Sequence, residues 1–472
     1  MKQGRFLSVC ILMLFCLCTT GQTLDEAKIL YQEGLYAKAL PAFQAEYHIN
    51  PGNPSVNQWL GVSLFETGRI LEAQKYLEFA SERKIPEAHI CLGELYTLLY
   101  RFEDAEKEFE KYQRVKRRDQ AALEKLVPKR AYAEKLRKAV SHTEDLQIID
   151  SMVVSKPDFL TAYNLSTSSG SLKPVRAFFS DRAATGETLF MNERKDKIYY
   201  SRGNAAAGID LYTMEKLLDT FGNEKRLPES VNRKGDQAYP FVLNDGITLY
   251  FASTDEPSLG GYDLFATRYN FTNDSYLSPN QLNVPFNSPF NDYMLAIDEE
   301  KGIGWFASDR FQPDGLVCIY TFIPNPQVQP LEIDDAHHLA RRARISSIAD
   351  TWKPDVDYRS LRSLARQKSV SHQETAGDFT FVINDRITCH TLSDFRSERA
   401  RALFSQALGY EKQLQRLNGE LSQKRDRYAE NRTDSSLAAS ILQLEKESES
   451  LSRETETLRI QARNEEIRTR FN

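Results

Sequence analysis

Histidine and cysteine are scarce in this chain, and no apolar stretch is long enough to cross a membrane. The 472 residues include 7 His and 6 Cys, and the cysteines at positions 10, 16 and 18 lie within the first 21 residues. The other three, Cys91, Cys318 and Cys389, are too widely spaced for a disulfide framework or for a zinc site with paired short spacings. We expect them to be small buried hydrophobic side chains, with one disulfide among them as the open alternative.

Motifs that mark common catalytic sites are also missing. The sequence has no nucleophile elbow, no paired metal ligands, no Walker loop and no dinucleotide fingerprint. The pair Gly260-Gly261 lies between two expected strands, so it does not indicate a phosphate loop. We therefore predict that the protein is not an enzyme, and that it has no catalytic residues, no metal ligands and no cofactor.

Basic residues are not in excess, since 61 Lys and Arg stand against 66 Asp and Glu, a formal net charge of −5. This argues against nucleic acid as a partner, because surfaces that bind it broadly are normally basic. The hydrophobic share of 41% is enough for a buried core. The length suits two to four modules.

Residues 1–21 have the features of a secretory signal peptide. Two basic residues precede an apolar run at 6–18, which is too short to span a bilayer, and small residues follow it. We expect an exported, periplasmic protein whose mature chain has no transmembrane helix. An outer-membrane-associated lipoprotein is the alternative, because Cys16 and Cys18 lie near the cleavage zone, although large residues precede both.

Residues 24–140 are predicted to form repeating helix pairs. Three sets recur at a nearly constant step: Gly34, Ala39 and Phe43; Gly68, Ala73 and Leu77; Tyr100, Ala105 and Phe109. Gly61 and Gly93 recur at a similar step. Small residues let paired helices approach, and large apolar residues fill the gap. The pattern resembles the tetratricopeptide repeat (TPR), whose period is about 34 residues. This resemblance implies an α-solenoid with a concave groove that suits a peptide or a partner helix.

The basic run from Lys111 to Arg118 is interpreted as a solvated helix face, with contact to an acidic partner as the alternative. Residues 120–140 are expected to add one more helix, which caps the array.

Residues 145–330 are predicted to form β units that recur at a nearly constant spacing along the chain. The expected strands are 188–190, 198–201 and 208–212; then 239–243, 247–253 and 262–265; then 293–297, 305–308 and 318–320. Residues 146–180 are candidates for further strands. Residues 376–395 are predicted to supply displaced final strands, because Val-Ile-Asn-Asp-Arg-Ile-Thr at 382–388 mirrors Val-Leu-Asn-Asp-Gly-Ile-Thr at 242–248.

The segment 331–372 is predicted to be a helical insertion between these β units. It contains the pair His337-His338, whose side chains would point in different directions on a helix. We therefore do not expect them to share a metal ion.

The β units resemble WD40-like (PD40) blades of TolB-type β-propellers. Tyr-Phe-Ala-Ser at 250–253 and Gly-Gly-Tyr-Asp-Leu-Phe at 260–265 carry the resemblance. It implies a central propeller-like domain, with a sandwich or an incomplete propeller as the alternative. Acidic residues in the expected loops are candidates to bind calcium or a substrate, although turn formation explains them more simply. They are Asp255, Glu256, Asp309 and Asp314. Tyr262 could stack on a sugar ring, but burial between blades is preferred.

Residues 396–472 are predicted to form an antiparallel coiled-coil hairpin. The first apolar seam is Leu403, Ala407, Tyr410, Leu414, Leu417, Leu421 and Tyr428, and the second is Leu437, Ile441, Leu444, Leu451, Leu458 and Ala462. Turn formers at 431–434 separate the two seams, and Thr433 or Asp434 is expected to cap the second helix. A dimer seam is the competing interpretation. The fold class is therefore multidomain α + β.

The order of modules resembles exported proteins of Bacteroidota that combine TPR and PD40 repeats, some of them in the type IX secretion apparatus. The resemblance covers residues 24–330, and the chain departs from it where a coiled coil follows the blades. Two interaction modules beside no recognisable active site lead us to expect a non-catalytic periplasmic or cell-envelope scaffold that binds protein partners through the repeat groove and a propeller face. The alternative is a propeller-based module that binds glycan or peptidoglycan, or an enzyme that acts on the cell wall.

Overall fold

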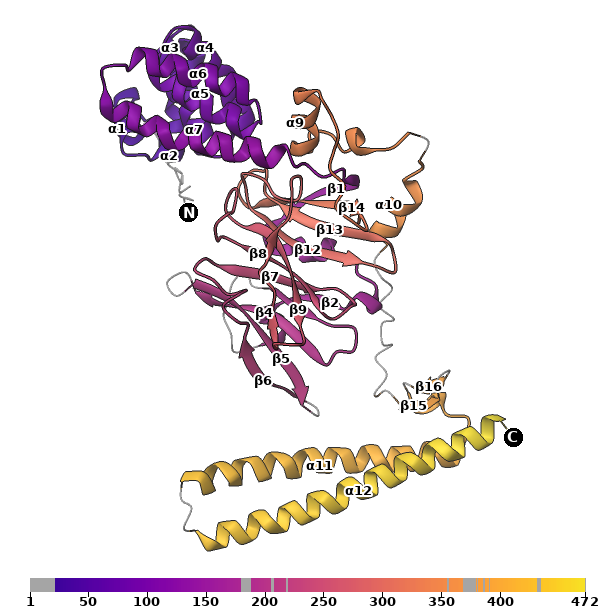
Figure 1. Ribbon diagram of the computed structural model, residues 1–472. Helices are drawn as coiled ribbons and strands as arrows, with labels where there is room; N and C mark the ends of the chain where they lie inside the picture. Colours follow the sequence, from indigo (N-terminus) through magenta and orange to yellow (C-terminus); the bar gives the residue numbers. More distant parts are fainter. Residues whose placement is uncertain are drawn as a thin grey trace, which may run out of the picture. The chain divides into compact units, whose positions relative to one another are not determined.

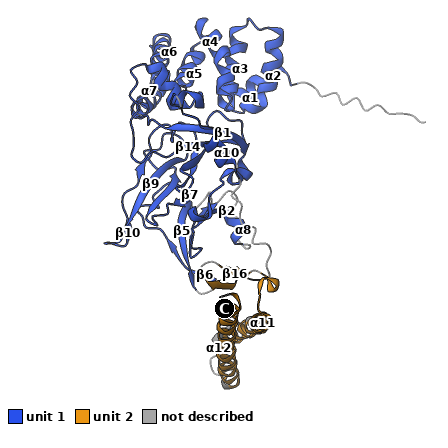
Figure 2. Ribbon diagram, turned by 90° about the vertical axis from the view of Figure 1, so that its right-hand side faces the viewer, with its two compact units in different colours: residues 1–369 blue, residues 370–472 orange. Residues whose placement is uncertain are grey.

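The computed structural model divides into two compact units, residues 1–369 and 370–472 (Figure 2). The structure describes residues 22–179, 188–204, 208–217, 220–354, 356–367, 379, 381–384, 387–389, 391–430 and 434–471. The expected signal peptide, residues 1–21, lies outside the described residues.

The first unit begins with helices stacked as antiparallel pairs (Figure 1). They are α1 (Leu24–Gln32), α2 (Tyr36–Ile49), α3 (Pro54–Glu66), α4 (Ile70–Glu82), α5 (Pro86–Leu98), α6 (Phe102–Val115) and α7 (Gln120–Val140). The sequence marks where these helices start. The Thr23 side chain caps α1, and the Asn53 side chain caps α3 just before a proline. The helix pairs predicted for residues 24–140 are confirmed.

Two glycines allow the paired helices to touch. A Cβ atom at Gly61 would lie 2.8 Å from Cγ of Leu77, and one at Gly93 would overlap the ring of Phe109. The large side chain of the second helix in each pair thus occupies the space that the glycine leaves. This is the packing that the recurrence of these two glycines predicted.

Central antiparallel strands follow the helices. They are β1 (Gln147–Ser155), β2 (Ser171–Pro174), β3 (Thr188–Met191), β4 (Lys197–Asn204), β5 (Gly208–Leu217), β6 (Thr220–Arg226), β7 (Gln237–Val242), β8 (Thr248–Ser253), β9 (Asp263–Asn270), β10 (Ser275–Tyr276), β11 (Asn280–Gln281), β12 (Asp292–Asp298), β13 (Ile303–Ser308) and β14 (Leu316–Ile323). They form three sheets, in the orders β2-β3-β4-β5-β6, β10-β9-β8-β7 with β11 on β9, and β1-β14-β13-β12. The strands expected in each repeat are confirmed. The sheets formed by the described strands do not close on themselves.

An asparagine staples each of two successive sheets in the same way. Asn232 accepts a hydrogen bond from Leu211 N (2.8 Å) and donates to Leu211 O (2.9 Å). Asn287, at the next sheet along the chain, does the same to Leu264 N (2.6 Å) and Leu264 O (2.9 Å). Leu227 N and Leu282 N also donate to these two carbonyls, so each asparagine links its strand to the segment beside it and supplies the acceptor for the strand's amide. We call these two residues the asparagine staples.

A segment after β1 fills the space between the second and third sheets. Phe159 makes edge contacts with the rings of Tyr239 and Tyr293, and Tyr163 donates a hydrogen bond to Met294 O (2.6 Å). Phe159 and Tyr163 belong to a core cluster that includes residues of all three sheets. The interior between the sheets is therefore packed with aromatic side chains and is not an open channel.

The inserted helices α9 (Ala336–Arg344) and α10 (Arg359–Arg366) are separated by a 3₁₀ turn, η3 (Ile348–Thr351). The Thr351 hydroxyl accepts a hydrogen bond from Ile148 N (2.9 Å), and Arg366 forms an ion pair with Asp150 (2.6 Å). Both contacts lie on β1, the edge strand of its sheet. The insertion therefore covers part of an edge that would otherwise stay open to other strands.

The helical array and the sheets meet at α7. Tyr132 donates a hydrogen bond to Leu259 O (2.6 Å), and Lys135 binds Glu256 (3.0 Å) and Ser258 O (2.7 Å). Tyr100, which is 5% exposed, packs in a cluster with residues of α7 and of the β loops. The array is thereby attached to one end of the sheets.

The second unit contains β15 (Phe381–Asn384), β16 (Ile387–Cys389), α11 (Glu398–Glu430) and α12 (Ser435–Phe471). The two long helices pack along each other, and Asp434 caps α12 by accepting hydrogen bonds from two backbone amides. Strands β15 and β16 lie in the segment 376–395, where final strands were expected, and among the described strands they pair only with each other. A hairpin this short cannot bury its own apolar face, and Phe381 and Cys389 instead pack with residues of α11 and α12.

We predict that Gly93→Ala lowers the free energy of unfolding of the first unit by about 1–3 kcal/mol, because the new methyl group would overlap the Phe109 ring. The better helix propensity of alanine offsets only about 1 kcal/mol. Denaturant unfolding measures the change. The control is Gly409→Ala in α11, where nothing lies within 4 Å of the new Cβ and alanine should stabilise the helix. Equal or greater stability of the Gly93→Ala protein would contradict the packing role.

Candidate functional site

A groove runs between helices α3, α5 and α7 of the array. It consists of two adjoining hollows of about 590 and 380 Å³, which share Glu94, Lys125 and Lys129. The larger hollow is mainly apolar and contains the half-buried Phe65 and Leu98. We call this surface the helical groove.

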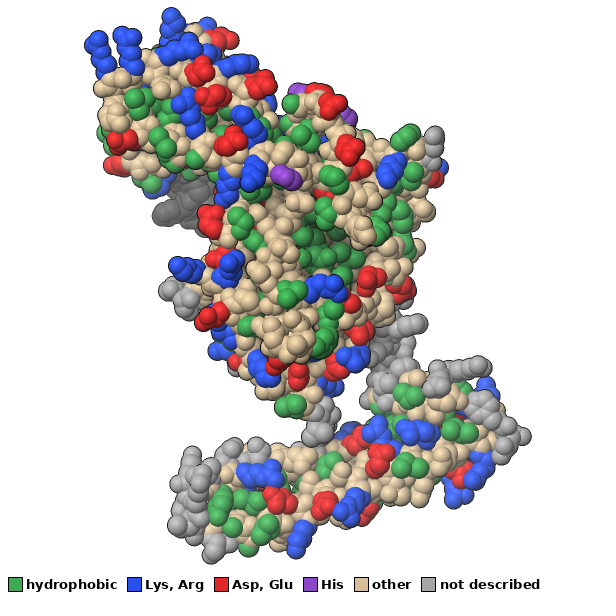
Figure 3. Space-filling model, viewed as in Figure 1, with side chains coloured by type: hydrophobic (Ala, Val, Ile, Leu, Met, Phe, Trp, Pro, Cys, Tyr) green, Lys and Arg blue, Asp and Glu red, His purple; other side chains and the backbone are tan. Residues whose placement is uncertain are grey.

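The two walls of the helical groove carry opposite charges. Helices α3 and α5 contribute Glu66, Glu87 and Glu94, and the other wall contributes Lys116, Lys125 and Lys129 together with one acidic residue, Asp119. Lys116 pairs with Glu87 (3.6 Å). Lys129 forms an ion pair with Glu94 across the groove, at the place where the two hollows meet. Figure 3 shows acidic and basic side chains interspersed on the visible face of the array, without a large area of one sign.

A serine, a histidine and a glutamate meet inside the array, but their geometry is not that of a nucleophilic triad. Glu108 Oε2 accepts from the Ser81 hydroxyl (2.7 Å) and lies 2.7 Å from His89 Nδ1, which is itself 3.0 Å from Ser81. One ring nitrogen thus faces both partners, whereas a triad uses both nitrogens. All three residues are at most 6% exposed. This cluster stabilises the packing of α4, α5 and α6 and offers no room for a substrate.

Burial raises the pKa of Glu108, but hydrogen bonds from His89, Lys111 and Ser81 outweigh it and bring the pKa down to about 2. Glu108 is therefore a charged acceptor at neutral pH.

The acidic loop residues of the β region mainly hold loops together. Asp255 accepts from Gly235 N (2.7 Å), Asp309 accepts from Asn291 N and Nδ2 (2.9 Å each), and Glu256 pairs with Lys135. A hollow of about 320 Å³ includes Asp309 and Asp314 beside Lys156. Within the part of the chain that the structure describes, no group of three or more His, Cys, Asp or Glu side chains is placed to hold a metal ion.

The other residues considered from the sequence take structural positions. A Cβ atom at Gly260 would lie 2.5 Å from Phe290 O, so this glycine allows loops of neighbouring sheets to touch. Tyr262 is half-buried and makes an edge contact with Tyr239. Cys91, Cys318 and Cys389 are buried and free, as expected. In the basic run, Lys111 and Arg114 pair with glutamates of α6. None of the described helices is long and apolar enough to cross a membrane.

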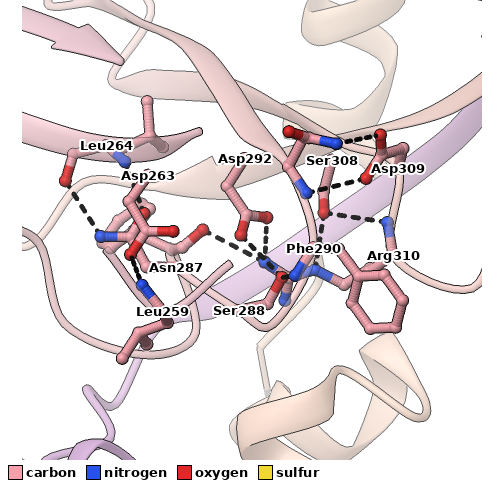
Figure 4. A network of polar contacts seen from close by, with 12 residues as sticks. Leu259, Asp263, Leu264, Asn287, Ser288, Phe290, Asp292, Ser308, Asp309 and Arg310 are labelled. Carbon is pink, nitrogen blue, oxygen red and sulfur yellow. Dashed lines mark hydrogen bonds and ion pairs between the residues drawn. The ribbon is translucent and has the colours of Figure 1, made fainter. Parts of the chain in front are cut away.

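A buried network of charges lies where the second and third sheets meet the array (Figure 4). Arg310 donates to Asp292 (2.6 Å), Ser288 donates to the other oxygen of Asp292 (2.6 Å), and all three residues are at most 2% exposed. Asp263 is fully buried and accepts from Leu259 N (2.9 Å), whereas its Oδ1 atom has no hydrogen-bond partner among the described residues. Burial, reinforced by the negative charge of Asp292, raises the pKa of Asp263 to about 7.

The sequence did not reveal the residues of the helical groove or of this network. Phe65 and Leu98 have the spacing of ordinary core residues, and only the packed array separates core positions from groove positions. Pro128, which lies inside α7 and lines the groove, was the one local irregularity available. Asp263 stood in the repeated Gly-Asp pattern, but its burial beside a second carboxylate depends on contacts between sheets.

Comparison of the chain with models of known families, with curated proteins and with solved structures finds no match, so a functional argument has to rest on the geometry described above.

We predict that Asp263→Asn stabilises the protein more at pH 8 than at pH 5. A carboxyl group whose pKa is raised from about 4 in the unfolded chain to about 7 in the folded chain keeps its proton longer in the folded chain. The wild-type protein therefore loses stability as the pH rises through this window, by a few kcal/mol in all, roughly 1.4 kcal/mol per pKa unit. Asparagine does not titrate and removes this loss.

Urea unfolding of both proteins at the two pH values measures the difference. The control is Asp314→Asn, which changes an exposed carboxylate and should show no such dependence on pH. The free energies of unfolding of wild type and Asp263→Asn could differ by the same amount at pH 5 and pH 8. That result would contradict the raised pKa of the buried Asp263 carboxyl group.

Proposed function

We propose that this protein is a non-catalytic scaffold of the periplasm or cell envelope, which binds a peptide segment of a protein partner in the helical groove. In this proposal the helix pairs are tetratricopeptide repeats and the three sheets are part of an incomplete PD40-type propeller. The observation that carries the proposal is the groove itself, which has an apolar floor between an acidic wall and a basic wall.

The chemistry of the groove indicates what the segment should contain. Apolar side chains would fill the larger hollow over Phe65 and Leu98. Basic side chains would face Glu66, and acidic side chains would face Lys125. Neither residue forms an ion pair with another described residue. Such an arrangement fixes the direction of the bound segment, because a reversed segment would place like charges together.

The export of the protein rests on residues 1–21, whose basic start and short apolar run favour a secretory signal. Glycan or peptidoglycan binding is the second candidate function. The hollow beside Lys156, Asp309 and Asp314 is the observation that favours it, but Asp309 is already engaged by Asn291.

The proposal predicts that peptides selected on the wild-type protein from a random display library bind through the groove. Leu98→Ser and, separately, Lys125→Glu should weaken their binding about tenfold, because one variant removes apolar contact and the other reverses a charge on the basic wall. Fluorescence anisotropy with labelled peptide measures the dissociation constant.

The matched control is Leu71→Ser on α4, where the leucine is 59% exposed and lies outside the groove. Its binding should equal that of the wild type. If no peptide is selected while soluble muropeptides raise the melting temperature, the scaffold proposal fails and the glycan-binding candidate replaces it.

A further inference from the structure

The hairpin of α11 and α12 has one flank that is closed by polar contacts. Glu411 pairs with Arg459 (3.0 Å), Arg425 pairs with Glu445 (2.6 Å), and Ser448 donates to Asn418 (3.0 Å). Glu411, Asn418 and Arg425 share one heptad position beside the α11 seam, and Glu445 and Arg459 share one beside the α12 seam. Ser448 belongs to the α12 seam itself, seven residues after Ile441. This flank resembles the finished edge of a two-stranded coiled coil.

The opposite flank has one contact between the helices, from Lys424 to Ser440 (2.7 Å), and a hollow beside it. A groove of about 390 Å³ lies there, and Leu417 of α11 and Leu451 of α12 form its apolar part. Both leucines are half-buried. In α12, leucines recur at heptad spacing on either side of Leu451, at 437, 444 and 458, and all are half-buried. These leucines belong to the seam between the two helices, and at the groove Leu417 and Leu451 keep part of their apolar surface exposed.

The seam between α11 and α12 contains little apolar surface next to these leucines. The positions of α12 that face α11 most directly include Ser448 and Thr455, and Thr455 is 6% exposed. Small polar residues at these positions bring little apolar surface into the interior of a coiled coil. The half-buried leucines beside them therefore contribute more apolar surface than Ser448 and Thr455 do.

Glutamates form the walls of the groove. Glu420 lines it from α11, and Glu447 and Glu454 line it from α12, with Arg416 as the one basic side chain in the lining. Glu420 has a partner in Lys424 (3.0 Å), whereas Glu447 and Glu454 form no ion pair with a described residue. The groove thus combines an apolar floor with mainly acidic walls.

We propose that this flank of the hairpin binds an amphipathic helix of a partner protein, whose apolar stripe is bordered by lysine or arginine. The apolar stripe of that helix would cover Leu417 and Leu451 and complete a three-helix arrangement. Its basic residues would face Glu447 and Glu454, as residues at the borders of a coiled-coil seam commonly do. This surface is separate from the helical groove, and the proposal does not depend on the function of that groove.

A second copy of the hairpin is a poorer occupant than a basic helix. Two copies packed through this groove would bring six glutamates to one interface, with one Arg416 from each copy to offset them. Like charges placed together lower the affinity of an interface. Self-association is therefore an outcome that the test has to separate from partner binding.

The test uses the full chain and two designed helical peptides of about 28 residues, four heptads, with leucine at the seam positions. One peptide has lysine at the border positions, and the other has glutamate there. We expect the lysine peptide to bind at least tenfold more tightly than the glutamate peptide, with an affinity that falls as salt rises. Isothermal titration calorimetry measures both.

Reversal of the wall charges supplies the decisive variant. The double variant Glu447→Lys, Glu454→Lys should lose at least tenfold in affinity for the lysine peptide and gain affinity for the glutamate peptide. The matched control is Glu449→Lys, Glu456→Lys, which makes the same charge change two residues along α12, outside the groove lining. Circular dichroism checks that the helices of each variant are intact.

Several results would overturn the proposal. They are equal affinity for the two peptides, equal losses in the two double variants, and no binding of either peptide by the wild-type chain. Sedimentation equilibrium checks a further outcome. A stable dimer of the full chain that Leu451→Ala dissociates would assign this flank to a second copy and overturn the proposal.

Discussion

The backbone of Tyr100 is the constraint on which the arrangement of the first unit depends. Gly34 and Gly68 end α1 and α3 in left-handed conformations, with φ of 76° and 78°, and Tyr100 takes the same conformation after α5 with φ of 58°. A side chain at that position costs roughly 1 kcal/mol or more. Tyr100 offsets the cost because its ring is buried in the cluster that contains Leu136 and Leu259, where the array meets the sheets. A glycine would suffice at position 100 if the chain only had to turn there. Tyr100 also attaches the array to the sheets through its buried ring.

Charged side chains are buried near Tyr100, at a place where apolar residues would avoid the cost of desolvation. One guanidinium, that of Arg310, lies among two fully buried carboxylates, so Asp292 is matched and Asp263 is not. A buried pair of this kind adds little net stability, but a misplaced sheet would leave each charge unpaired at a cost of several kcal/mol. The network therefore acts mainly on specificity: it rejects alternative placements of neighbouring sheets more strongly than it stabilises the correct one. The asparagine staples Asn232 and Asn287 work in the same sense, since each satisfies two backbone groups that only one register presents.

The features that the sequence predicted well are those that repeat locally. The spacing of Gly61 and Gly93 implied helix pairs in close contact, and the Asn-Asp-Gly turn at 244–246 implied the hairpin of β7 and β8. The likeness of 382–388 to 242–248 indicated strands, and β15 and β16 form there, but such a likeness does not say with which strands they pair. Phe381 buries its ring against Phe404 of α11, a contact between residues that share no motif. The helical groove and the Asp263 network were equally hidden, since both arise where elements distant in the sequence meet.

The potentially reactive side chains named above form contacts that hold the structure together. Ser81, His89 and Glu108 contact one another within the array. Asp255 and Asp309 accept hydrogen bonds from backbone amides of adjacent loops. A group already committed to holding structure is poorly placed to exchange protons or ligands with a substrate, because its release would unpair a neighbour. Exposed charged side chains that form no ion pair with a described residue lie beside partly exposed apolar surface at Glu66 and Lys125 in the helical groove, and at Glu447 and Glu454 in the hairpin. A partly exposed apolar floor with a polar rim is the combination on which the proposals for the two grooves rest.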